Sequence, residues 1–68
     1  MIEKRMHLAD ALRLAMEKEQ AAQDFYDEAL KVVENPGVAA LFEFLRKEEV
    51  KHRQLIQDEY DKVVQPDN

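Results

Sequence analysis

One stretch decides the fold of this chain: Leu45-Arg46-Lys47-Glu48-Glu49-Val50-Lys51-His52. It contains Glu-x-x-His, in which Glu49 and His52 stand three residues apart. On an α-helix two such side chains lie on one face, about one turn apart. Both fall in register with large apolar residues, so we expect both to face a core. Ionisable groups in a core need a partner or a metal.

The apolar period around this stretch predicts a helix over about residues 38–64, which stops before Pro66. Its inner face is expected to consist of Val38, Phe42, Leu45, Glu49, His52, Ile56, Tyr60 and Val63. The gaps between these residues are three or four, as on one face of a packed helix. Only the level of Glu49 and His52 breaks the apolar character of this face.

A matching pattern predicts a first helix over about residues 8–34. Its inner face is expected to consist of Leu8, Leu12, Ala15, Glu19, Ala22, Tyr26, Ala29 and Val33. Glu19 is its one charged member. Further apolar residues widen the arc on both helices to roughly 160°: Ala11, Leu14, Phe25 and Val32 on the first, and Leu41, Phe44 and Leu55 on the second. An arc this wide predicts that each helix touches two neighbours.

The break between the helices is Asn35-Pro36-Gly37, at residues 35–37. Asn35 suits a helix N-cap and Pro36 suits the first helical position. A short connection joins antiparallel neighbours. We therefore expect residues 1–68 to form a single all-α domain, an antiparallel two-helix hairpin.

Folding the hairpin at this turn brings the three polar inner-face residues together. Glu19 precedes Pro36 by 17 residues, while Glu49 and His52 follow it by 13 and 16. At about 1.5 Å per residue, all three fall within about one helical turn of the same height. One hairpin leaves much of each apolar arc exposed, which marks an interface. We expect a homodimer, or a higher homo-oligomer, that completes a ferritin-like four-helix bundle.

Such a dimer would combine a Glu from each of two helices with Glu-x-x-His from each of the other two. That is the ligand pattern of ferritin-like di-iron and di-manganese proteins. Two divalent cations would neutralise four carboxylates, which would otherwise repel one another. The ligands suit iron or manganese, and zinc as well. Taken singly, Glu19 could instead fix the helix register, and Glu49 and His52 could be a surface pair. Glu48 fits a solvated flank better than a bridging role.

Composition narrows the remaining functions. The chain has 68 residues and no cysteine, so it holds neither disulfides nor thiolate metal sites. A net charge of −5 argues against nucleic acid or an anionic membrane surface as a partner. The first residues lack the apolar stretch of a signal peptide, and no run could span a bilayer. We expect a cytoplasmic protein.

Two segments resemble the helix motifs of rubrerythrin-like proteins. Residues 19–26, Glu-Gln-Ala-Ala-Gln-Asp-Phe-Tyr, resemble the first motif, E-x-x-A-x-x-F-Y. Leu41-Phe42-x-x-Leu45, followed by Glu48-Glu49-x-x-His52, resembles the second. The resemblance implies a di-iron carboxylate site with Glu19, Glu49 and His52 as metal ligands. It also implies that Tyr26 supports the site, for example through a hydrogen bond to a ligand carboxylate.

The single-hairpin layout is similar to that of encapsulated ferritins, which form a di-iron site between two subunits and act as ferroxidases. Their C-terminal docking tail is not recognisable in residues 63–68. The resemblance implies a ferroxidase-like protein that oxidises Fe(II) with dioxygen or peroxide, for iron handling or protection from oxidative stress. Two alternatives stay open. One is a small helical homodimer that serves as an interaction or assembly module with a degenerate or structural metal site. The other is a zinc or manganese site that staples the dimer.

Overall fold

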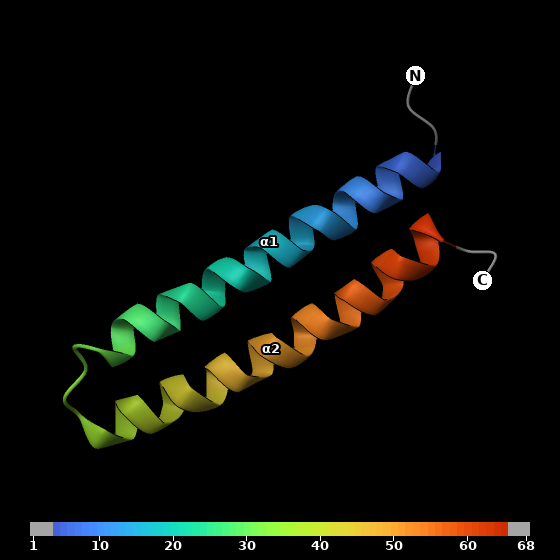
Figure 1. The fold of residues 1–68 in the computed structure, drawn as a ribbon. Helices are drawn as coiled ribbons and strands as arrows, with labels where there is room; N and C mark the ends of the chain where they lie inside the picture. The colour runs from blue at the N-terminus through green and yellow to red at the C-terminus, as the bar shows by residue number, and fades with distance from the viewer. Residues whose placement is uncertain (1–3, 66–68) are drawn as a thin grey trace.

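The computed structural model describes residues 4–65, with side chains from residue 7. This part of the chain forms two helices, α1 (Lys4–Leu30) and α2 (Pro36–Val64), and no strand. The helices lie side by side and antiparallel, and their free ends meet at one end of the molecule (Figure 1). The dimensions are 49 × 25 × 12 Å, so the hairpin is a single layer of helices. The predicted all-α helical hairpin is confirmed. Neither helix, within the described range, is long and apolar enough to cross a bilayer.

The turn has the predicted chemistry at the start of α2. Asn35 is the N-cap in extended conformation (φ −72°, ψ 120°), and its side-chain oxygen accepts a hydrogen bond from Val38 N at 3.0 Å. Pro36 is the first helical residue, where its missing N–H costs nothing. A β-carbon on residue 37 would lie 3.3 Å from Asn35 Oδ1, so Gly37 leaves room for the capping side chain.

The bounds of α1 differ from the expected 8–34. The helix starts at Lys4, ahead of Leu8 where the predicted apolar period begins, because Lys, Arg and Met are good helix formers. It ends at Leu30, since Asn35 must be extended before a proline and the chain needs several residues to reverse. The last turn tightens: Lys31 N bonds Glu28 O at 3.2 Å and Val32 N bonds Ala29 O at 3.1 Å. α2 likewise begins at Pro36 rather than near residue 38.

Contacts between the helices run the length of the hairpin. Met16 and Gln23 are the most buried described side chains, at 8% exposure each. Towards the turn, Tyr26 and Phe42 stack at a tilt with ring centroids 5.5 Å apart, and Phe25 joins them at 5.4 Å from Tyr26. Towards the free ends, Arg13 donates to the Tyr60 hydroxyl at 3.2 Å and lies over its ring.

One broad side of the hairpin carries the apolar residues that the helix pair leaves uncovered. Successive helical residues are about 100° apart around the helix axis. When each helix is viewed from its N-terminus, its exposed apolar residues lie on the same rotational side of its contact with the other helix. Because the helices are antiparallel, the two arcs fall on the same side. We call this side the open face. It comprises Ala11, Leu14 and Phe25 of α1 and Leu41, Phe44 and Leu55 of α2, and the five large side chains are 51–65% exposed. A patch of this kind indicates an interaction surface.

Candidate metal centre

The middle of the hairpin brings Glu19 of α1 together with Glu49 and His52 of α2. His52 Nδ1 lies 3.5 Å from Glu19 Oε1 and 3.4 Å from Glu49 Oε1. One potential ligand atom from each of the three residues lies within 4.8 Å of the other two. The convergence predicted by counting residues from the turn is therefore confirmed, while metal ligation by these residues stays a prediction.

The three side chains sit at the edge of the helix contact. Glu19 and Glu49 are mostly covered, with 25% and 21% of the side chain exposed, whereas His52 is half exposed. His52 lies 11 residues after Leu41, about three turns along the same face of α2. The cluster therefore opens toward the open face rather than into a closed core.

Two carboxylates this close disturb one another. A hydrogen bond with the Glu49 carboxyl, partial burial and the charge of Glu49 together raise the pKa of Glu19, and the nearby His52 opposes the rise. That hydrogen bond requires a proton on one of the two carboxyls. Glu19 Oε1 is shielded from solvent, and no described residue donates to it with full hydrogen-bond geometry. The metal-free cluster thus favours uptake of a proton.

A divalent cation fits this donor set. Two carboxylate oxygens and one imidazole nitrogen are ligands that iron, manganese and zinc accept. The shielded, unpartnered oxygen of Glu19 is the clearest sign of fit, since a buried acceptor is costly without a partner. Three protein ligands from one hairpin would leave further coordination positions for other ligands, as catalytic sites do.

Two other candidates occupy different surroundings. Tyr26 is half-buried in the aromatic cluster with Phe25 and Phe42. No hydrogen bond joins it to Glu19, Glu49 or His52 within the described residues, and its role beside a bound metal stays a prediction. Glu48 pairs with Lys51 at 3.3 Å, and its side chain is 33% exposed, so it is more covered than the solvated flank charge that was predicted.

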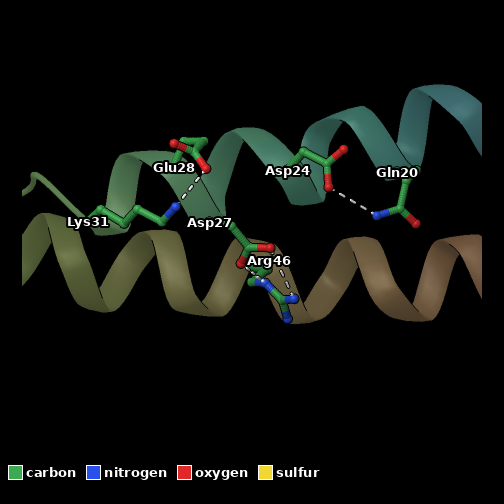
Figure 2. Close-up of polar contacts among 6 residues, drawn as sticks. All are labelled: Gln20, Asp24, Asp27, Glu28, Lys31 and Arg46. Carbon is green, nitrogen blue, oxygen red and sulfur yellow. Dashed lines mark hydrogen bonds and ion pairs between the residues drawn. The ribbon is translucent and has the colours of Figure 1, made fainter.

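Polar contacts next to the cluster were not expected. Arg46 donates through Nε and a terminal nitrogen to the two carboxylate oxygens of Asp27, which joins the helices (Figure 2). This ion pair raises the pKa of Arg46. Gln23 is buried between this pair and Glu19. Asp27 precedes Pro36 by nine residues and Arg46 follows it by ten, so the residue count that aligned Glu19 with His52 could have found the pair.

Comparison with known proteins places the whole cluster inside one family model. The model described as Rubrerythrin matches residues 1–66, which include Glu19, Glu49 and His52. No curated protein and no solved structure matches the chain. The resemblance drawn from the two helix motifs is therefore confirmed.

Proposed function

The chain belongs to the rubrerythrin family, and from this premise we propose that it is a di-iron carboxylate protein that binds Fe(II) and oxidises it with dioxygen or peroxide. The observation that carries the proposal is the convergence of Glu19, Glu49 and His52, with ligand atoms within 4.8 Å. In this proposal Fe(II) is both the bound metal ion and the substrate. It supplies the electrons, and the chain supplies the ligands and their geometry.

The proposed site is shared between two subunits. The open face supports this, because the cluster opens toward it and its apolar side chains are exposed in the single hairpin, where a second copy would cover them. A twofold pair would hold four carboxylates and two imidazoles, so that two divalent cations neutralise the carboxylates. Within one chain, the hydrogen bond with Glu49, partial burial and the charge of Glu49 already raise the pKa of Glu19.

Each ligand has a distinct part in the proposal. Glu19 and Glu49 would hold the metal through carboxylate oxygens, and His52 would hold it through one ring nitrogen. The other ring nitrogen of a ligating histidine normally needs an acceptor. Dimerisation would also exclude water from the half-exposed His52, which strengthens every electrostatic contact at the site.

Anaerobic Fe(II) titration followed by native mass measurement tests the proposal. Two irons per pair of chains are expected, and Glu49→Ala should lose both because a ligand of each metal disappears. Glu43→Ala is the matched control, since Glu43 is an exposed carboxylate elsewhere on α2. Iron binding that survives Glu49→Ala would contradict the proposal.

An assembly module with a structural or degenerate metal site is the second candidate, and the extent of the open face favours it. Iron-dependent oxygen or peroxide consumption separates the two functions, since the module predicts none. A zinc or manganese staple would raise the melting temperature strongly without turnover.

A further inference from the structure

One bidentate ion pair joins the two helices beside the candidate metal centre. Arg46 of α2 donates through Nε and a terminal nitrogen to the two carboxylate oxygens of Asp27 of α1 (Figure 2). Among the described residues, every other pair of a lysine or arginine with a carboxylate lies within a single helix. A planar guanidinium that meets a carboxylate at two points fixes both the distance and the orientation of the two groups. The pair therefore constrains the relative height of the two helices where it lies.

This ion pair stands close to the metal ligands along both helices. Arg46 precedes Glu49 by three residues, about 4.5 Å along the axis of α2, which places it one turn away on the same side of the helix. Asp27 follows Glu19 by eight residues, about 12 Å along α1. Any slide of α2 along α1 would carry Glu49 and His52 past Glu19, and the ion pair opposes that slide.

The apolar packing around the cluster resists such a slide weakly. The residues one turn before and one turn after Glu19 on its own face are Ala15 and Ala22, and both are half-buried. Side chains this small form shallow ridges, which interlock little with a facing helix. Metal ligands must be held within about 0.5 Å, which is about a third of the rise of one residue. The ion pair supplies the directional constraint that this packing lacks.

We propose that Asp27 and Arg46 are positioning residues of the metal centre, whose ion pair holds α1 and α2 at the relative height that lets Glu19, Glu49 and His52 share a metal. The inference rests on the proposed function. Without the pair, the chain also populates heights at which the three ligands do not converge, and the apparent metal affinity falls with the fraction of chains that stays competent. Because the two side chains are 38% and 45% exposed, solvent screens the pair, and we expect a loss of about three- to tenfold.

Neutral variants of the two partners test this role through the sign of their effects. Asp27→Asn and Arg46→Gln should each lower the Fe(II) affinity about three- to tenfold, measured anaerobically by competition with a chromophoric chelator. Charge alone predicts otherwise, since removal of the Arg46 cation one turn from Glu49 would strengthen cation binding. The double variant should lose no more affinity than either single variant, because the pair acts as a unit. Glu28→Gln is the matched control, since the ion pair of Glu28 with Lys31 lies within α1 (Figure 2).

The Co(II)-loaded protein separates positioning from stability. Its visible absorption should shift in Asp27→Asn and Arg46→Gln, because the ligand geometry changes, and should stay unchanged in Glu28→Gln. Circular dichroism should show that all three variants keep their helix content.

Two results would overturn the inference. One is an Arg46→Gln protein that binds Fe(II) as tightly as the wild type, or more tightly. The other is a pair of variants that lose metal-free stability but keep the Fe(II) affinity and the Co(II) spectrum, which would assign the ion pair to stability alone. If Glu49→Ala abolishes iron binding while Arg46→Gln leaves it unchanged, only this inference fails. If Glu49→Ala also binds iron, the proposed function itself fails.

Discussion

Leu41 offers the sharpest test of the proposed dimer. It lies on the open face, about three turns from His52 on the same side of α2, and it is 51% exposed in the single hairpin. We expect Leu41→Gln to weaken dimerisation without unfolding the chain. Glutamine keeps the length and the helix propensity of the side chain, so the change removes mainly apolar surface.

The size of the effect follows from the exposed fraction. Complete burial of a leucine side chain contributes about 1.5–3 kcal/mol. Roughly half of that, about 0.8–1.5 kcal/mol per subunit, is still to be gained when a second copy covers Leu41. Twofold symmetry counts the residue twice, which gives about 1.5–3 kcal/mol per dimer. The dissociation constant of the dimer should therefore rise roughly 10- to 150-fold.

Sedimentation equilibrium on metal-free protein measures this constant, with circular dichroism to confirm that helix content is unchanged. Val50→Gln is the matched control: Val50 is 44% exposed but stands two residues from His52, which places it on the opposite side of α2. A wild-type chain that stays monomeric at all concentrations would refute the dimer. Weakening by Val50→Gln but not by Leu41→Gln would refute the assignment of the open face.

Two further variants probe the turn and the charge state of the cluster. Asn35→Ala removes the side-chain oxygen that accepts the hydrogen bond from Val38 N. It should lower the free energy of unfolding by about 1 kcal/mol in urea denaturation, whereas Asn35→Asp should preserve that free energy. An alanine variant as stable as the wild type would show that the cap contributes nothing. Glu19 has a raised pKa, so in metal-free protein its protonated form stabilises the fold at pH below the ordinary glutamate pKa, and this stabilisation is lost as pH rises through the raised value. The stability of Glu19→Gln should not decline in this way, so this variant should be the more stable protein at pH above the raised pKa of Glu19. Over the same pH interval, the affinity of the wild-type protein for Fe(II) should increase, because Glu19 ionises. Parallel pH profiles of stability for the two proteins would contradict this.

The hairpin and the level of the cluster were predictable because both depend on local rules. The three- and four-residue period requires helices, and Asn35-Pro36 fixes where α2 begins. Counting from that fixed point then places Glu19 opposite His52. The end of α1 was not predictable in the same way, since nothing in its apolar period shows how many residues the chain needs to reach the extended Asn35.

The polar contacts between the helices were missed for a different reason. The apolar period predicts inner faces that include Ala15, Ala22 and Ala29 on α1 and Leu45 and His52 on α2. In the structure the helices meet at one side of these arcs. Gln23, Asp27 and Arg46 therefore lie in the contact, as does Arg53, whose shielded Nε lacks a partner among the described residues.

This displacement bears on the proposed assembly. A hairpin that was stable as a complete unit would turn the centre of each apolar arc toward the other helix, since that buries the most apolar area. Here Phe25, Phe44 and Leu55 stay more than half exposed, while polar side chains share the helix contact with apolar ones such as Met16. We therefore expect a second surface to cover the other side of both arcs. Glu19, Glu49 and His52 lie between the side of each helix that contacts the other helix and the apolar side chains of the open face. A second copy that covers the open face would therefore meet this hairpin at the candidate metal centre.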